Sequence, residues 1–267
     1  MEEIDLTSWD DFPSAIREVY NNHETHEFGQ WLIPNDILFR GQADSSWKLR
    51  TTLERFSVDA LPVWKYADVV HRCGPVVQSH TGRSWDLLTG DQIAQWFGNW
   101  EPITGQIPEY SFWIYLRQCG FPSPLLDWSG SPFVAAYFAA SERCDADRFA
   151  VYAYVETPEG GKGGYVGATS ISVQGPNVRA HPRHFIQQSW YTICTKLVEN
   201  EYVFACHDEV FSTGSANQDL LIKITLPATE RMKALKELRR MNITSFSLFQ
   251  TEEALMRTLA FERLEML

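Results

Sequence analysis

The sequence predicts an α+β protein in which a mixed, mainly antiparallel sheet forms the core and helices flank it. Two stretches, residues 148–155 and 219–226, carry an apolar side chain at every second position, as a strand packed on a core does. Helical patterns lie before, between and after these stretches, without the regular strand–helix alternation of a doubly wound parallel sheet. We therefore expect a sheet of several strands packed between helices.

The N-terminal part predicts one helix followed by one short strand. Residues 8–21 place apolar side chains at helical spacing, and Thr7 or Ser8 can cap the first turn. A Pro-Asn turn signal then precedes the apolar run 37–40, which predicts a strand. Because this strand ends in Arg40, a fixed positive charge stands where the chain leaves the sheet.

The next part of the chain is less regular. Residues 45–56 predict a loop that passes into a short helix, and residues 57–110 predict an irregular insertion with helical patches. A helix is expected over 110–119, because Gly120 and Pro122 follow it directly and end helices.

Three further helices are predicted. Ser131 can cap a helix over 132–142, and this helix is apolar on nearly every side, which predicts a buried position at the centre of the fold. The chain ends in helices over 230–241 and 252–264, each preceded by a threonine that can cap it, Thr229 and Thr251.

Composition favours a single soluble unit over residues 1–267, because no linker or repeat interrupts the chain. Thirty-four acidic and 23 basic residues give a net charge of −11, which disfavours non-specific nucleic-acid binding. No apolar run is long enough to span a membrane, and no signal peptide is expected. Five cysteines without paired spacing predict reduced thiols and a cytoplasmic location.

Several common site motifs are missing or incomplete. Close Cys and His neighbours at 71–73 and 206–207 lack the spacing of metal ligands, so we expect no metal. No G-x-S-x-G nucleophile motif occurs. The glycine-rich run 160–164 fits neither phosphate-loop pattern and predicts a mobile hairpin loop.

Asp127 carries a charge within the apolar run Leu125-Leu126-Asp127-Trp128, directly before the predicted buried helix. An isolated buried carboxylate is very costly, so Asp127 must be paired or hydrogen-bonded. Arg40 is the candidate partner. The alternative is a structural role for Asp127, which would cap the turn into the helix at Ser131.

These segments resemble the FRG domain family. The first block is Phe39-Arg40-Gly41-Gln42 with the later Trp47, Leu49 and Arg55. The second block runs from Gln118 to Ala140 and contains the Leu-Leu-Asp-Trp sequence. The third block is carried by Arg183, Gln187, Ser189 and Tyr191, and the segments around 223–227 and Phe249 also fit. The resemblance thus covers nearly the whole chain, as one FRG-type domain.

The chain departs from the family pattern at four positions. Cys119 stands directly before Gly120, where the family has a His, so any chemistry of that His is lost here. The other three departures are Ser in place of Thr, Pro in place of Arg and Ser in place of Gly, at Ser123, Pro124 and Ser189.

The order of the blocks is similar to that of ADP-ribosyltransferases of the Arg-Ser-Glu type, and it implies their fold and NAD as the substrate. By this resemblance Arg40 would bind phosphate, while Ser129 or Ser123 would orient the site. A late carboxylate would stabilise the ribosyl cation as nicotinamide leaves. The third block offers Gln187, which is uncharged, whereas Glu201 lies in a Glu-x-Glu sequence and is either this acid or a solvated strand edge.

The resemblance therefore implies catalytic roles for Arg40, Gln187 and Glu201. It implies ligand contacts by Gly41, Gln42, Gln118, Asp127, Trp128 and Ser129. We expect an NAD-dependent ADP-ribosyltransferase or NAD glycohydrolase-like protein, a toxin or defence protein of a bacterial or phage conflict system. A protein acceptor or an antitoxin would then be its macromolecular partner.

Two other functions are open. A non-catalytic module that binds or senses a nucleotide-like small molecule would use the same residues without breaking a bond. A nuclease is disfavoured by the acidic charge and by the lack of a carboxylate cluster for metal ions.

Overall fold

The computed structural model describes residues 1–28, 31–56, 60–98, 107–158, 168–178, 182–211 and 219–265. Its strands are β1 (Glu2–Asp5), β2 (Thr25–Phe28), β3 (Trp31–Pro34), β4 (Ile37–Gln42), β5 (Leu126–Ser129), β6 (Arg148–Val155), β7 (Ser170–Gln174), β8 (Ser189–Val198), β9 (Glu201–Phe204) and β10 (Leu220–Pro227). Its helices are α1 (Phe12–His23), α2 (Thr52–Arg55), α3 (Val63–Thr81), α4 (Gly90–Gly98), α5 (Tyr110–Gln118), α6 (Pro132–Ser141), α7 (Arg183–Ile186), α8 (His207–Phe211), α9 (Arg231–Arg240), α10 (Ser245–Phe249) and α11 (Glu252–Ala260).

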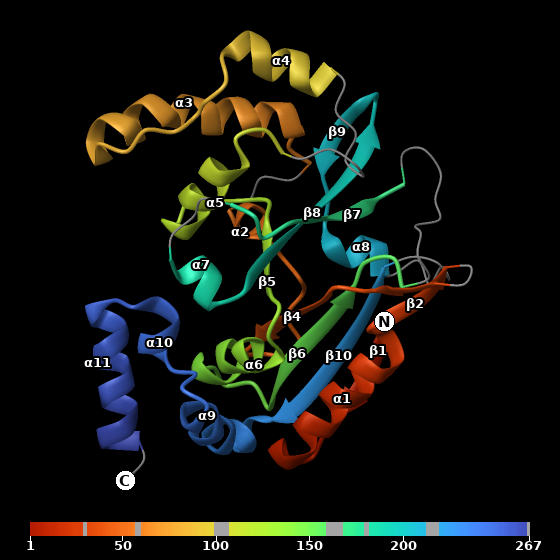
Figure 1. Ribbon diagram of the computed structural model, residues 1–267, viewed down its shortest axis with the longest axis vertical. Helices are drawn as coiled ribbons and strands as arrows, with labels where there is room; N and C mark the ends of the chain where they lie inside the picture. Colours follow the sequence, from red (N-terminus) through yellow and green to blue (C-terminus); the bar gives the residue numbers. More distant parts are fainter. Residues whose placement is uncertain are drawn as a thin grey trace.

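Eight strands form one sheet, in the order β1-β10-β6-β4-β5-β8-β7, with β9 paired to β8. Only the β1–β10 pair is parallel among the described strand pairs, and the others are antiparallel. Strands from the two ends of the chain therefore lie side by side in the same sheet (Figure 1). The predicted α+β class with a mixed, mainly antiparallel sheet between helices is confirmed.

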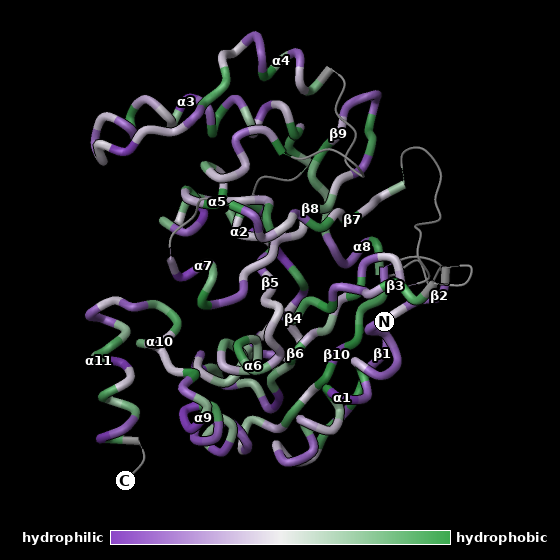
Figure 2. The backbone as a smooth tube through the Cα atoms, viewed as in Figure 1, coloured by the Kyte–Doolittle hydropathy of each residue, from purple (hydrophilic) through white to green (hydrophobic). Residues whose placement is uncertain are grey.

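Helices cover the sheet in two groups (Figure 1). At one end α1, α6 and α9 pack on the apolar side chains of β4, β6 and β10. At the other end α3, α4 and α5 form a second apolar cluster with β8 and β9. Figure 2 shows β6 and β10 as apolar strands in the interior, whereas the outer turns of α9 and α3 are hydrophilic.

Most of the predicted elements are present. The strands at 37–40, 148–155 and 219–226 correspond to β4, β6 and β10, and the buried helix after Ser131 is α6, whose first turn Ser131 caps at Val134 N. Thr251 caps α11 as expected. Thr229 does not cap α9, because it lies inside the short 3-10 helix Ala228–Glu230 and the cap position is Glu230.

The segment 57–110 is more regular than expected, since its described residues contain α3 and α4. Gly74 and Pro75 lie inside α3, and these residue types interrupt a helical pattern in the sequence. The side chain of Leu87 packs against Gly74, which explains the need for a small residue there. The predicted hairpin loop at 160–164 lies outside the described residues.

Candidate functional site

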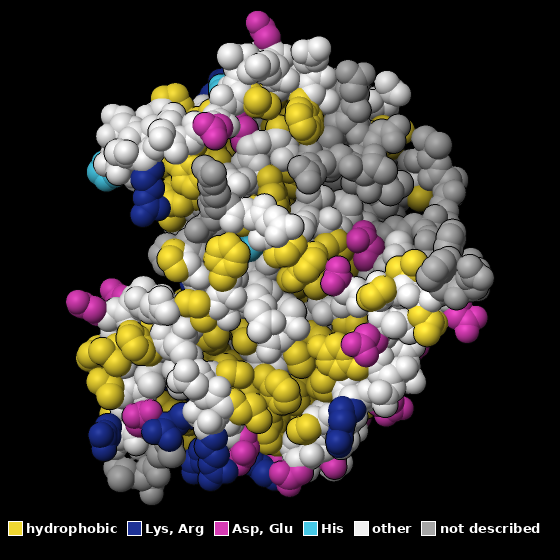
Figure 3. Space-filling model, viewed as in Figure 1, with side chains coloured by type: hydrophobic (Ala, Val, Ile, Leu, Met, Phe, Trp, Pro, Cys, Tyr) yellow, Lys and Arg dark blue, Asp and Glu magenta, His cyan; other side chains and the backbone are white. Residues whose placement is uncertain are grey.

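A cavity of about 1070 Å³ opens between two walls of the molecule. One wall, the sheet wall, is built by β4, β5 and the neighbouring helices α2, α5 and α7. The facing wall, which we call the C-terminal wall, is built by α9, α10, α11 and the end of α6. Figure 3 shows the molecule hollowed on the side where α7 and α10 approach each other in Figure 1. We call this cavity the arginine pocket, because its lining contains Arg40, Arg55, Arg117, Arg143, Arg183, Arg231, Arg239 and Arg257.

The charge of this lining opposes the charge of the whole chain. Eight of the sixteen arginines line the arginine pocket, although the chain carries a net charge of −11. Among the described lining residues there are two carboxylates, Asp127 and Glu142, and no lysine. Guanidinium groups match the oxygens of carboxylate and phosphate in pairs, so this lining favours an anionic ligand.

Gly41 places α6 directly against the strand that carries Arg40. A Cβ atom at this position would lie 1.9 Å from the carbonyl oxygen of Ala135 and 2.6 Å from the backbone nitrogen of Ala139. No side chain fits in that space, so α6 can pack this closely on β4 only at a glycine. The charge of Arg40 is therefore placed directly beside this contact. Sequence reasoning found both residues but could not show why the glycine is required.

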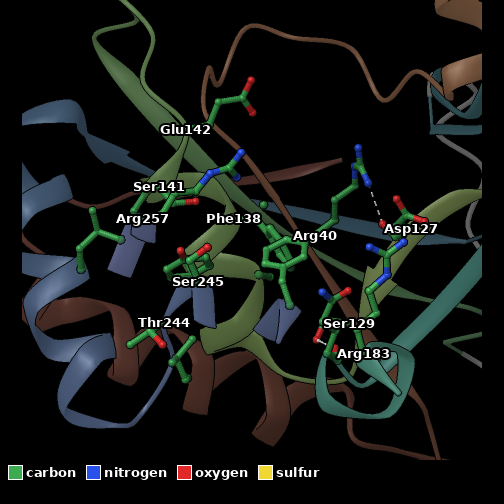
Figure 4. A pocket seen from close by; sticks show the side chains of 18 of the residues that line it. Arg40, Asp127, Ser129, Phe138, Ser141, Glu142, Arg183, Thr244, Ser245 and Arg257 are labelled. Carbon is green, nitrogen blue, oxygen red and sulfur yellow. Dashed lines mark hydrogen bonds between the residues drawn. The ribbon is translucent and has the colours of Figure 1, made fainter. Parts of the chain in front are cut away.

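Arg40 lies where β4 and β5 separate. The two strands pair at Phe39 and Ser129, and continued pairing would place Gly41 opposite Asp127. Instead, Arg40 Nη1 donates to the carbonyl oxygen of Asp127 at 2.8 Å (Figure 4). Its Nε is buried without a partner, and Nη2 makes no hydrogen bond, within the described part of the chain.

The Arg40 guanidinium keeps its charge at neutral pH. Burial lowers its pKa to about 10, and the carboxylate of Asp127 opposes that effect. A half-satisfied guanidinium in a cavity wall is prepared to bind an anion, because its remaining donors gain little from the protein itself.

The carboxylate of Asp127 pairs with Arg117, not with Arg40. Arg117 donates to both carboxylate oxygens, from Nε at 2.5 Å and from Nη2. Burial raises the pKa of Asp127, but the charge and hydrogen bonds of Arg117 and the charge of Arg40 outweigh it and hold this pKa below its usual value. The predicted Arg40–Asp127 ion pair is therefore wrong, although the two residues do lie together.

Asp127 remains open to the arginine pocket. About 48% of its side-chain surface is accessible, whereas Arg117 is 9% accessible. Arg117 also donates to the Thr52 hydroxyl at 3.0 Å, which fixes its guanidinium. The geometry thus presents an ionised, oriented carboxylate beside the free donors of Arg40.

Ser129 and Gln187 line the pocket but also hold its framework. The Ser129 hydroxyl donates to the Gln187 carbonyl oxygen at 2.7 Å and accepts from the backbone nitrogen of Ser131. The Gln187 side chain donates to the carbonyl oxygen of Leu248 at 3.0 Å, which ties the two walls together. Both residues lie in the lining that contains Arg40, and their hydrogen bonds are those of supporting residues.

Gln118 lines the pocket. Its amide nitrogen lies 3.4 Å from the Tyr191 hydroxyl, and its carbonyl oxygen on the backbone accepts from Arg183. The side-chain Oε1 is buried without a partner in the described residues. Figure 4 shows Arg40 and Arg183 extending towards Asp127.

Three residues that the sequence predicted for the site have other positions or roles in the structure. Gln42 is absent from the lining, and its amide donates to the Lys48 carbonyl oxygen at 3.3 Å. Trp128 contributes to the lining, but its ring lies in the core, where Nε1 donates to Thr192 at 2.8 Å. Glu201 begins β9, is exposed and lies outside the lining, so the structure does not bring it to Arg40.

Behind the sheet wall, a buried network supports Trp128. The Thr192 hydroxyl accepts from the Trp128 indole and lies 2.8 Å from His207 Nε2. Burial and the charge of Arg40 lower the pKa of His207 to about 3. His207 is therefore a structural residue of this wall.

Residues 35–148 match the family model of the FRG domain. This part of the chain is similar to the FRG domain. The match contains β4, α5, β5 and α6, and with them Arg40, Arg117 and Asp127. The third block of the resemblance, around Gln187, and the helices α9, α10 and α11 of the C-terminal wall lie outside the matched residues.

No curated protein and no solved structure matches this chain. The likeness of its fold to ADP-ribosyltransferases therefore stays a prediction. Among the described helices, none is both long and apolar enough to cross a membrane. The described His, Cys, Asp and Glu residues contain no group of three placed to hold a metal ion.

Proposed function

We propose that the arginine pocket binds a phosphate-bearing, nucleotide-like ligand. The residues that match the FRG domain and the C-terminal segments that line the pocket would bind it together. One observation carries this proposal: an acidic chain gathers half of its arginines around a single cavity, with two carboxylates among them. Such concentration raises the local positive potential and the local concentration of anions.

The proposed anchor is Arg40. Its Nη2 makes no hydrogen bond within the described residues, and its backbone is held by β6 on one side and by α6 on the other. A guanidinium fixed in this way loses little conformational entropy when it binds phosphate. Small-molecule pockets span roughly 300–1,000 Å³, so a cavity of about 1070 Å³ has room for a dinucleotide such as NAD.

A thermal-shift screen against NAD, ADP-ribose and ADP tests the proposal. A ligand present at one hundred times its Kd stabilises the folded protein by about 2.7 kcal/mol. We expect at least one of these ligands to raise the melting temperature of the wild type, and we expect this increase to be lost in Arg40→Ala. Because alanine also leaves a cavity in the sheet wall, Arg40→Met serves as a second variant that removes the charge but keeps most of the side-chain volume.

The matched control is Arg72→Ala, an exposed arginine on α3 outside the pocket lining. The ligand should raise the melting temperature of this variant as much as it raises that of the wild type. The assignment of Arg40 as the anchor would be contradicted if no ligand raised the melting temperature of the wild type. It would also be contradicted if both Arg40 variants showed the same increase as the wild type.

Cleavage of NAD is a second candidate, and the accessible carboxylate of Asp127 favours it. In this reaction the bond between ribose C1′ and the nicotinamide nitrogen breaks, and nicotinamide leaves with the electron pair. Water or an acceptor nucleophile then bonds to C1′ and releases a proton. Asp127, held ionised by Arg117, would stabilise the positive charge on the ribose in place of the remote Glu201.

Release of nicotinamide from NAD by the purified protein distinguishes catalysis from binding alone. Release of nicotinamide by the wild type that decreases in Asp127→Asn would support catalysis. Binding of NAD without release of nicotinamide would support a sensing module. The role in a toxin or defence system that the FRG resemblance implies stays a prediction.

A further inference from the structure

The wall opposite Arg40 carries a second group of anion-binding side chains. Arg257 of α11 lies there beside Ser245 of α10 and beside Ser141 and Tyr137 of α6, and all four line the arginine pocket. Figure 4 shows Arg257, Ser141 and Ser245 together, with Phe138 between them and Arg40. These residues come from three helices, and α6 meets α10 and α11 only in the folded chain.

Arg257 is available to a ligand, unlike two other arginines of the same wall. Arg239 is engaged by Glu262 at 2.7 Å. Arg231 donates to the carbonyl oxygens of Ala139 and Glu142 and closes the end of α6. Arg257 has neither a hydrogen bond nor an ion pair among the residues that the structure describes, and it is exposed.

Hydroxyl groups surround the same position. Tyr137 lies close enough to Ser245, Arg257 and Ser141 for each of them to influence its titration. Burial raises the Tyr137 pKa against the combined effect of these three neighbours, so its hydroxyl keeps its proton and can donate. One guanidinium and three hydroxyls supply the donors that a phosphate group needs.

An aromatic pair lies between the two charged groups. The rings of Phe138 and Phe249 are 6.0 Å apart and perpendicular to each other, and both line the pocket. Their faces offer stacking or edge contacts to a base. The order of the lining is therefore cation, aromatic pair, cation.

We infer that Arg257, Tyr137, Ser141 and Ser245 form a second anion subsite, and that the ligand carries two phosphate groups separated by a nucleoside. This inference rests on the proposed function, because it assigns the first phosphate to Arg40. A mononucleotide would occupy one subsite, whereas a nucleoside bisphosphate would occupy both.

Calorimetric titration with adenosine 5′-monophosphate and adenosine 3′,5′-bisphosphate tests the subsite. We expect the wild type to bind the bisphosphate at least about 10-fold more tightly, since a charge-assisted contact contributes on this scale. Arg257→Ala should remove most of this preference and leave the affinity for the monophosphate within about 2-fold. Tyr137→Phe should reduce the preference by a smaller factor.

The control is Arg263→Ala, an exposed arginine of the same C-terminal segment that lies outside the lining. It removes the same charge and should keep the full preference. Equal affinities of the wild type for the two probes, or an undiminished preference in Arg257→Ala, would overturn the subsite alone. If neither probe binds the wild type, the subsite is overturned, whereas the proposed function fails only if NAD, ADP-ribose and ADP also fail to bind in the thermal-shift screen.

Discussion

The two walls of the arginine pocket are built by different means. The sheet wall, which carries Arg40 and Asp127, is fixed by strand pairing, by the close approach of α6 to Gly41 and by the Arg117 ion pair. The C-terminal wall, which carries Arg257, is joined to the sheet wall by side-chain contacts such as Gln187 to Leu248.

The two walls therefore have different roles in the pocket. The part of the sheet wall that carries Arg40, Arg117 and Asp127 lies within the FRG match and holds its charges in one geometry. Helices α9, α10 and α11 of the C-terminal wall lie outside the match and present Arg257, which has no partner among the described residues. Substitutions in the sheet wall should therefore change the stability of the fold, and substitutions in the C-terminal wall should leave the fold nearly intact.

The largest effect is expected for Gly41→Ala. The new methyl group would meet the backbone oxygen of Ala135 at 1.9 Å, and backbone atoms of two packed elements cannot move aside cheaply. We expect the free energy of unfolding to fall by about 3 kcal/mol or more. Urea denaturation measures this change.

Gly175→Ala is the control, because no atom of the described residues, apart from its chain neighbours, lies within 4 Å of its added methyl group. It should change the free energy of unfolding by less than about 1 kcal/mol. Equal stability of Gly41→Ala and the wild type would show that α6 and β4 are not packed as described.

A smaller, pH-dependent effect is expected for His207, behind the sheet wall. Its pKa of about 3 in the folded protein lies below the usual 6.5, so the unfolded chain binds a proton that the folded chain does not. The protein should therefore lose stability as the pH falls below 6.5, by about 2 kcal/mol at pH 5 from this residue.

His207→Gln should flatten the pH dependence of the free energy of unfolding between pH 7 and pH 5 by that amount. His80→Gln, on the exposed surface of α3, should leave the slope unchanged. A slope in His207→Gln equal to that of the wild type would mean that His207 is not buried as a neutral ring.

The smallest effect is expected in the C-terminal wall. Arg239→Ala removes an ion pair with Glu262 in which both side chains retain solvent contact. Such pairs contribute little, so we expect a loss of about 0.5 kcal/mol in the free energy of unfolding. A loss as large as that of Gly41→Ala would abolish the proposed contrast between the walls.

Sequence reasoning located the sheet wall because its residues lie in short, distinctive patterns. Arg40 ends an apolar strand and Asp127 interrupts an apolar run, so each stands out against its neighbours. The choice of partner was missed, because Arg117 and Arg40 reach the same aspartate from different elements. Only the separation of β4 from β5 shows why Arg40 takes the carbonyl oxygen and Arg117 the carboxylate.

The C-terminal wall could not be predicted in the same way. Helix α11 was found from Thr251 and its apolar spacing, but a helical pattern does not say which exposed residue faces a cavity. Arg257 gains its importance from α6, more than one hundred residues earlier in the sequence. Glu201 shows the reverse case, since its local sequence suggested a catalytic acid and its strand lies away from the pocket.

Calorimetric titration of ADP-ribose into the wild type and Arg40→Met tests the central claim most directly. We predict saturable binding by the wild type and a Kd at least about 10-fold higher for Arg40→Met, since one charge-assisted hydrogen-bonding group is lost. The same Kd for both proteins, or no binding by the wild type, would contradict the claim that Arg40 anchors a phosphate-bearing ligand.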